Sequence, residues 1–343
     1  MPVSIHEIIP EGKAGVSLSD IQAASKRIRP YVRRTHLLYE PVLSKDTGTE
    51  LYIKPEMLQL TGAFKVRGAF NKILQLSEEE RERGIITSSS GNHAQACAYV
   101  GEQLGVKAVV VIPEDAPEVK IRNAKAMGAE VILWDRSYDA RWEKVLEESR
   151  EHGYTMVHGY EDFDIMAGQG TMGLEILEDL PDTDQVLVPI GGGGLISGIA
   201  TAIKESRPDV KVIGVQTESS DAYYESRKAG HPVSVESRPT LADGITCGTP
   251  GENPYPIIEK YVDDIVTVRE DSIEEAIRRI ADRAKVLAEP ASSVGVAALL
   301  EGKVKGEGRK TVSLLTSGNW DLEKFAHLFL HESVHKIELK SAK

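Results

Sequence analysis

The stretch Thr61-Gly62-Ala63-Phe64-Lys65-Val66-Arg67-Gly68-Ala69 places one lysine between two glycines and directly after an aromatic ring. It comes just past an apolar run, Leu51-Tyr52-Ile53, that predicts a strand. A lysine held in a tight, partly desolvated site has a lowered pKa and can form a Schiff base with a carbonyl compound. The same residues also fit a solvated lysine at the start of a helix. The choice between the two interpretations depends on the rest of the chain.

Three later segments each follow a strand-like apolar run. They are Ser88-Ser89-Ser90-Gly91-Asn92-His93, Gly191-Gly192-Gly193-Gly194 and Thr316-Ser317-Gly318-Asn319. In α/β proteins, ligands collect at the loops that follow the carboxyl ends of the strands. These loops strengthen the interpretation of the lysine segment as part of a ligand site.

Short β-branched runs alternate with amphipathic helical segments along almost the whole chain. Strands are predicted at 51–53, 85–88, 108–112, 130–133, 185–190, 210–215 and 311–315, and helices at 94–104, 118–127, 139–152 and 195–205. Continuous apolar strands separated by such helices are typical of parallel βαβ units, which are buried on both faces. Residues 219–256, rich in Ser, Gly and Pro, predict loops and short helices. The pattern indicates an α/β fold with two open parallel-sheet lobes and a cleft between them.

The bulk composition narrows the class of protein. The chain has 343 residues, enough for two lobes, and a formal net charge of -12 without a lysine or arginine block, which argues against nucleic acid as a partner. Two cysteines, Cys97 and Cys247, are too few for a disulfide scaffold. No apolar run approaches the roughly 18 residues of a membrane helix, and no signal pattern opens the chain. We therefore expect a cytoplasmic protein that contacts no membrane.

Gly191, Gly192, Gly193 and Gly194 lie between a predicted strand and a predicted helix. Glycines let the backbone approach a ligand closely, and a helix N-terminus offers free N–H groups and a positive dipole to a phosphate. The run is not a Walker loop, because no Gly-Lys-Ser/Thr ending follows, and Ser197 stands where the dinucleotide pattern needs its last glycine. A tight turn needs only one or two glycines, so four favour a phosphate site.

Two loops rich in hydroxyl and amide side chains are candidates for binding the polar groups of a ligand. Hydroxyl and N–H groups at the start of the helix after Ser88 can hold a carboxylate or a cofactor oxygen. A plain serine N-cap would account for one serine, but not for three followed by Gly91, Asn92 and His93. The loop at 316–319 fits an ordinary turn and a ligand loop equally.

Together these segments resemble the fold type II pyridoxal-phosphate enzymes, in particular the threonine dehydratase and serine racemase branch. The resemblance extends over residues 21–328 and is carried by motifs at 62–69, 89–93, 167–171 (Ala-Gly-Gln-Gly-Thr), 191–194, 242–244 (Ala-Asp-Gly) and 289–290 (Glu-Pro). It implies the two-lobed fold of tryptophan synthase β, with the cofactor in the cleft. Residues 1–80 and 161–343 would form the large cofactor-binding domain, and residues 81–160 a small inserted α/β domain.

The resemblance also implies which residues bind pyridoxal 5'-phosphate and the substrate. The cofactor-binding residues would be Phe64, Lys65, Asn92, Gly191, Gly192, Gly193, Gly194, Gly244, Glu289 and Thr316. The substrate-binding residues would be Ser89, Ser90, Gly91, His93 and Arg141, and the catalytic residues Lys65 and Ser90.

Several of these residues have a stated role in the family pattern. Lys65 would carry the cofactor as a Schiff base, with Phe64 behind the pyridine ring and Asn92 on the ring hydroxyl. The glycine N–H groups would hold the phosphate. Thr316, at a position that is usually serine in this branch, would meet the pyridine nitrogen, with adjacent Ser317 as a substitute. An alcohol is too weak an acid to protonate a pyridine, so the nitrogen should stay neutral, which favours prompt loss of a β-hydroxyl group.

The reaction implied is the dehydration and deamination of a β-hydroxy amino acid, foremost L-threonine and L-serine, to 2-oxobutanoate or pyruvate and ammonia. A serine or aspartate-type racemase stays open, because Ser90 stands where racemases place the acid opposite Lys65, and dehydratases often keep that serine too. A 3-hydroxyaspartate dehydratase stays open as well, since Arg141 could pair with a second carboxylate, although it equally fits a helix surface.

The same comparison gives expectations about metals and assembly. Racemases of this group carry a metal-binding glutamate and aspartate where this chain has Gln216 and Ala222, so we expect no metal site. The family implies a homodimer or homotetramer with a small-molecule amino-acid substrate.

The chain leaves no room for the regulatory domain of feedback-inhibited enzymes, so we expect a catabolic-type dehydratase insensitive to isoleucine. The run His-Gly-Tyr-Glu-Asp at 158–162 is expected to border the pocket.

Overall fold

The computed structural model describes residues 15–116 and 118–330 of the chain. Its larger sheet has six strands in the order β1-β2-β10-β7-β8-β9. They are β1 (Leu38–Tyr39), β2 (Glu50–Pro55), β7 (Gln185–Pro189), β8 (Lys211–Thr217), β9 (Asp264–Val268) and β10 (Lys310–Leu315). Every neighbouring pair is parallel except β1 with β2. This confirms a predominantly parallel α/β lobe.

A second, smaller sheet is formed by a continuous part of the chain inserted between β2 and β7. Its four strands pair in parallel in the order β5-β4-β3-β6. They are β3 (Ile85–Ser88), β4 (Ala108–Pro113), β5 (Glu130–Trp134) and β6 (Thr155–Met156). All four lie within the predicted insertion at 81–160, whose limits as a domain stay a prediction.

Strand β4, one of the two central strands of the smaller sheet, is apolar and is covered on both faces. Val109 and Val111 pack with Trp142 of α8 (Tyr138–His152), whereas Val110 and Ile112 pack on the opposite face. That opposite face is covered by α6 (Asn92–Leu104) and α7 (Glu118–Ala126). The alternation of side chains along a strand explains why a continuous apolar run is needed here.

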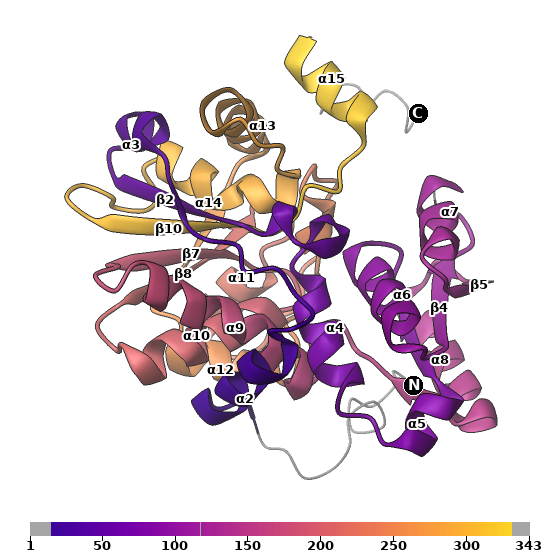
Figure 1. Ribbon diagram of the computed structural model, residues 1–343. Helices are drawn as coiled ribbons and strands as arrows, with labels where there is room; N and C mark the ends of the chain where they lie inside the picture. Colours follow the sequence, from indigo (N-terminus) through magenta and orange to yellow (C-terminus); the bar gives the residue numbers. More distant parts are fainter. Residues whose placement is uncertain (1–14, 117, 331–343) are drawn as a thin grey trace.

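Helices also cover both faces of the larger sheet (Figure 1). One layer contains α9 (Phe163–Asp179), α10 (Gly194–Ser206) and α12 (Pro254–Tyr261), with α2 (Leu18–Ile28) packed beside α9. The opposite layer contains α3 (Pro41–Thr47), α13 (Glu270–Arg279) and α14 (Pro290–Leu300). Helix α14 carries no charged residue because it is enclosed between the sheet and α13. The described chain ends with α15 (Leu322–Leu330).

The predicted elements are part of those that the structure contains. Each predicted strand and helix is present, with ends that differ by no more than two residues. The strands β1, β6 and β9 were not predicted, nor were several helices of the larger lobe, among them α2, α3, α9, α12, α13 and α14. The region predicted as loops and short helices contains the short helix α11 (Ala222–Ala229). Among the described residues, no helix is both long enough and apolar enough to cross a membrane.

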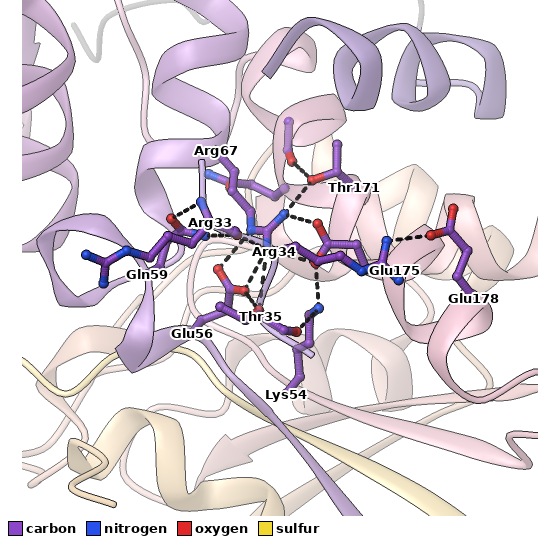
Figure 2. A network of polar contacts seen from close by, with 12 residues as sticks. Arg33, Arg34, Thr35, Lys54, Glu56, Gln59, Arg67, Thr171, Glu175 and Glu178 are labelled. Carbon is purple, nitrogen blue, oxygen red and sulfur yellow. Dashed lines mark hydrogen bonds and ion pairs between the residues drawn. The ribbon is translucent and has the colours of Figure 1, made fainter. Parts of the chain in front are cut away.

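A buried ion-pair network fixes helix α4 (Lys65–Ile73) in the larger lobe (Figure 2). The Arg67 guanidinium is fully buried and pairs at 2.8 Å with both Glu56 and Glu175. Lys54 supplies the second positive charge, 2.5 Å from Glu175. Two cations thus balance two carboxylates, and the hydrogen bonds between them satisfy groups that would otherwise be costly to bury.

Glycines bring α4 and α9 into unusually close contact. A Cβ atom at Gly168 would lie 2.6 Å from the Arg67 carbonyl oxygen and from the Gly68 Cα atom. The Gln169 side chain accepts a hydrogen bond of 3.2 Å from the Gly68 N–H group. The Ala-Gly-Gln-Gly-Thr motif therefore serves to seat α4, whose first residue is Lys65.

Candidate active site

Lys65 begins α4, directly after Phe64. Its Nζ atom donates a hydrogen bond of 2.9 Å to the Gly159 carbonyl oxygen and lies 5.1 Å from the centre of the Phe64 ring. Burial lowers the pKa of Lys65 to about 8, because the charged ammonium group is poorly solvated there. An appreciable fraction of the side chain is therefore a neutral amine near pH 7, able to act as a nucleophile or a base.

His93, in the first turn of α6, lies near Lys65 and is buried. Its Nε2 atom lies 3.1 Å from the Val157 carbonyl oxygen, so this nitrogen carries the proton and donates. Burial and the nearby lysine charge lower the pKa of His93 to about 3, which keeps the ring neutral. The Nδ1 atom is buried and has no partner within the described chain, so it can accept a hydrogen bond from a ligand.

Asn92 connects the start of α6 to the larger lobe. Its Nδ2 atom donates to Ser317 Oγ at 3.1 Å and to the Glu289 carboxylate at 3.2 Å. Its Oδ1 atom accepts from Asn319 Nδ2 at 2.9 Å. A Cβ atom at Gly244 would lie 3.3 Å from Glu289 Oε1, so Gly244 borders the same cluster. The structure thus gathers three of the predicted motifs at one place.

Thr316 follows β10 and is buried beside Phe64. The Phe64 N–H group donates to the Thr316 carbonyl oxygen at 3.0 Å, and Thr316 Oγ1 lies 2.9 Å from Ser292 Oγ. Ser292, on α14, also accepts from the Ser317 N–H group at 2.8 Å. The sequence offered no signal for Ser292, which lies three positions after Glu289 in a helix without charged residues. Its hydroxyl also donates to the Ser317 carbonyl oxygen at 2.8 Å, so three hydrogen bonds fix the loop that presents Thr316.

The tetraglycine run forms the turn from β7 to α10. Gly193 has a φ of +96°, a left-handed conformation that glycine adopts without strain. The Ser197 N–H group donates to the Gly193 carbonyl oxygen at 3.0 Å, so the N–H groups of 193–196 precede the first closed turn. A Cβ atom at Gly192 would lie 2.4 Å from the Tyr160 ring. Only glycine allows this packing, and the helix start can bind an anion.

Tyr160 connects the lysine segment with the glycine turn. It follows Gly159, whose carbonyl accepts from Lys65; its ring packs against Gly192, and its backbone and Cβ pack against Gly194. The Tyr160 Oη atom lies 3.0 Å from Tyr138 Oη in the smaller lobe. The segment at 158–162 therefore contacts both motifs, and burial raises the pKa of Tyr160 well above its usual value, so the hydroxyl keeps its proton.

The serine loop runs from the end of β3 to the start of α6. The Gly91 N–H group donates to Ser89 Oγ at 3.2 Å, and Ser90 is half-buried between them. Arg141, on α8, donates from Nε to Ser88 Oγ at 3.3 Å and from Nη1 to the Asp135 carbonyl oxygen at 3.2 Å. Arg141 thus lies beside the serine loop, held by groups of the smaller lobe.

The arrangement can accommodate a ligand with two distinct ends. The helix start at Gly193 suits a phosphate, and the Lys65 amine suits a reactive carbonyl group. Asn92, Thr316 and the neutral His93 supply further polar contacts between the two lobes. The chemistry of these groups fits pyridoxal phosphate.

The sequence profile of a family described as pyridoxal-phosphate dependent enzymes matches residues 28–318. This chain belongs to that family. The match covers both sheets and confirms the expected α/β fold of the fold type II enzymes, together with their cofactor. It contains the lysine segment, the serine loop and the tetraglycine run in full, and residues 316–318 of the last loop.

Relatives in the family include enzymes with different reactions. An L-threonine ammonia-lyase from Thermotoga maritima is 47% identical over 90% of this chain and 76% of its own length. A catabolic L-threonine dehydratase from Staphylococcus aureus is 41% identical over 92% of both chains. The crystal structure of serine racemase from Dictyostelium discoideum is 38% identical, with a TM-score of 0.85 over 90% of this chain and 99% of its own. The family fold therefore hosts both elimination and racemisation.

Proposed function

We propose that this protein catalyses pyridoxal-phosphate-dependent β-elimination of a β-hydroxy amino acid. L-Threonine and L-serine are the foremost substrates, giving 2-oxobutanoate or pyruvate and ammonia. The observation that carries the proposal is the buried Lys65 amine, whose pKa of about 8 leaves a base available at neutral pH. The relatives in Thermotoga maritima and Staphylococcus aureus, both named for threonine, support the choice of substrate.

The cofactor would be held by groups from both lobes. The N–H groups of Gly191, Gly192, Gly193 and Gly194 would bind the phosphate, and Asn92 would bind the ring hydroxyl. Phe64 would pack against the ring, and Thr316 would donate to its nitrogen, with Glu289 and Gly244 at the edge of this cluster. When bound, pyridoxal phosphate supplies an electron-withdrawing ring that makes the α-hydrogen of an attached amino acid acidic.

Lys65 would move the proton of the reaction. The neutral Nζ atom takes the α-hydrogen, after which the bond from Cβ to the hydroxyl oxygen breaks. The hydroxyl leaves with one proton as water, and a second water later replaces nitrogen at Cα, so the net products are a 2-oxo acid and ammonia. The Gly159 carbonyl, 2.9 Å from Nζ, orients the amine for this role.

The substrate carboxylate would be bound by neutral groups. Ser89, Ser90 and the N–H groups at the start of α6 surround the position, and the partial positive charge of the helix start offsets the negative charge. His93 contributes as a neutral ring, because burial keeps its pKa at about 3. Arg141 is the nearby cation, and its position beside Ser88 would favour a substrate with a second carboxylate such as 3-hydroxyaspartate.

A second candidate function is amino-acid racemisation, favoured by the similarity to the Dictyostelium serine racemase. Racemisation requires an acid on the face of Cα opposite Lys65. Ser90, half-buried in the loop before α6, is the residue that would supply it. The two functions share every step until the β-hydroxyl either leaves or stays.

Product analysis distinguishes these functions. The purified protein, loaded with pyridoxal phosphate, is given L-threonine, L-serine or L-threo-3-hydroxyaspartate separately, and both 2-oxo acid and the opposite configuration at Cα are measured. We expect 2-oxobutanoate from threonine and pyruvate from serine. In Ser90→Ala, we expect the rate at which the inverted amino acid forms to fall more than the rate at which 2-oxo acid forms. Accumulation of inverted amino acid without 2-oxo acid would establish the racemase instead.

A further inference from the structure

Tyr223 is a buried side chain that the proposed reaction does not use. It lies in the first turn of α11 and is 1% exposed. Its hydroxyl donates to the Gly192 carbonyl oxygen at 2.9 Å and accepts from the Gly251 N–H group at 2.9 Å. A tyrosine hydroxyl has one proton to donate, so this pair of bonds fixes its orientation and that of both partners.

The bond to Gly192 determines where the next N–H group points. In a trans peptide the C=O and N–H groups point in opposite directions, and the described chain has no cis peptide. With the Gly192 oxygen held by Tyr223, the Gly193 N–H group must point away from Tyr223. This N–H is the first of the free donors at the start of α10, where a phosphate would bind.

Tyr223 is itself held firmly. The Gln216 side chain accepts from the Tyr224 N–H group at 3.0 Å, which fixes the first turn of α11. The Tyr223 ring stacks on Tyr255, with ring centres 6.5 Å apart and planes inclined by 24°. A Cβ atom at Gly193 would lie 2.3 Å from Tyr223 Oη, so the hydroxyl lies directly behind the glycine turn.

The loop that contains Gly251, the second hydrogen-bond partner of Tyr223, is held by Glu161. The buried Glu161 carboxylate accepts from the Glu252 N–H group at 3.0 Å and from the Asn253 N–H group at 2.9 Å. A Cβ atom at Gly251 would lie 2.7 Å from the Gly192 carbonyl oxygen and 2.9 Å from Glu161. The loop at 251–253 is thus clamped between Glu161 and Tyr223 against the tetraglycine turn.

We propose that Tyr223 is a positioning residue that aims the Gly193 N–H group, and that Glu161 supports it through the loop at 251–253. Together they set the affinity of the site for the phosphate of the cofactor. This inference rests on the assignment of pyridoxal phosphate to the cleft. These contacts reach the glycine turn and not Lys65. They should therefore affect the affinity for a ligand that carries a phosphate, and leave the affinity for a ligand without a phosphate almost unchanged.

The test compares pyridoxal phosphate with pyridoxal, which lacks the phosphate. Each is titrated into the cofactor-free protein while the band near ~410 nm is followed. In Tyr223→Phe, which keeps the ring, we expect the Kd for pyridoxal phosphate to rise about tenfold, as for loss of one buried hydrogen bond, and the Kd for pyridoxal to stay within about twofold. Tyr224→Phe, the next residue on α11, is the matched control and changes neither value.

Two results would overturn the proposal. An equal rise in Kd for both ligands in Tyr223→Phe would mean general damage to the pocket. An unchanged Kd for both ligands would mean that Tyr223 does not act on the glycine turn. Glu161→Gln is a second variant in case Tyr223→Phe does not fold, with about threefold weakening expected for pyridoxal phosphate alone. If the unaltered protein binds neither ligand, the cofactor assignment itself fails, which is a different outcome.

Discussion

The lysine at the start of α4 and its chemistry could be predicted from the sequence, but the contacts that bury it could not. Two flanking glycines and an aromatic ring are visible in the sequence. The pKa of Lys65 depends on burial by segments far along the chain, including Gly159, which lies 94 residues away and accepts its hydrogen bond. Desolvation of this kind is a property of the folded site, so the sequence predicted the residue and the structure shows the burial that would make its amine reactive.

The lowered pKa of Lys65 predicts the pH dependence of cofactor attachment. Only the neutral amine attacks an aldehyde, so the rate at which cofactor-free protein reacts with pyridoxal phosphate should rise with pH and level off above a midpoint of about 8. Stopped-flow absorbance measures this rate. The control is Nα-acetyl-lysine, which keeps its side-chain amine. Its rate should continue to rise as the pH approaches the ordinary lysine pKa of about 10.4. A protein rate that rises as far as the control would contradict the assignment.

Glu161 predicts a change of stability with pH. Burial raises the pKa of this carboxyl group to about 7, even though two backbone N–H groups favour its charged form. The folded protein therefore holds the proton more tightly than the unfolded chain, so stability from this group is present at low pH and is lost as pH rises from about 4.5 to 7. Measured by urea unfolding, the free energy of unfolding relative to Glu161→Gln should fall by up to about 3 kcal/mol between pH 5 and pH 8. A difference that does not vary with pH would show that Glu161 is not shifted.

At the level of elements, hydrophobic runs predicted the central strands and four of the helices that connect them. The central strands are long and apolar because helices cover both of their faces, which leaves a strong signal in the sequence. The strands β1 and β6 contain two residues each, and their existence depends on pairing with β2 and β3. No local pattern can predict so short a strand. The run at 265–268 that forms β9 has strand character, but its place at the sheet edge depends on its partner β8.

The ion-pair network beneath α4 predicts a large loss of stability on removal of one charge. Arg67→Met leaves Glu56 and Glu175 buried without their main cation, which should cost roughly 3–5 kcal/mol of unfolding free energy. The matched control is Arg34→Met, because Arg34 pairs with Glu178 at the surface and its loss should cost only about 0–1 kcal/mol. Both arginines are visible in Figure 2. Equal losses in urea unfolding for the two variants would contradict the account of the network.

For the whole molecule, the candidate site depends on loops of the two lobes that contact each other. The serine loop follows β3 of the smaller sheet, whereas the glycine turn and Thr316 follow β7 and β10 of the larger one. The sequence predicted this convergence, since the carboxyl ends of parallel strands lie at one edge of a sheet. Tyr223 and Ser292 escaped prediction because each acts through backbone groups of distant loops. Such contacts leave no spacing or composition signal in the chain.

The central claim is that Lys65 catalyses the dehydration of a β-hydroxy amino acid, which leads after uptake of one water to a 2-oxo acid and ammonia. The most direct measurement is the yield of 2-oxobutanoate and ammonia from L-threonine by the protein and by Lys65→Ala, each supplied with pyridoxal phosphate. The account predicts equal amounts of the two products from the unaltered protein, and a rate lower by at least about 1000-fold from the variant, because one group serves as both anchor and base. Product formation by Lys65→Ala at the rate of the unaltered protein would contradict it.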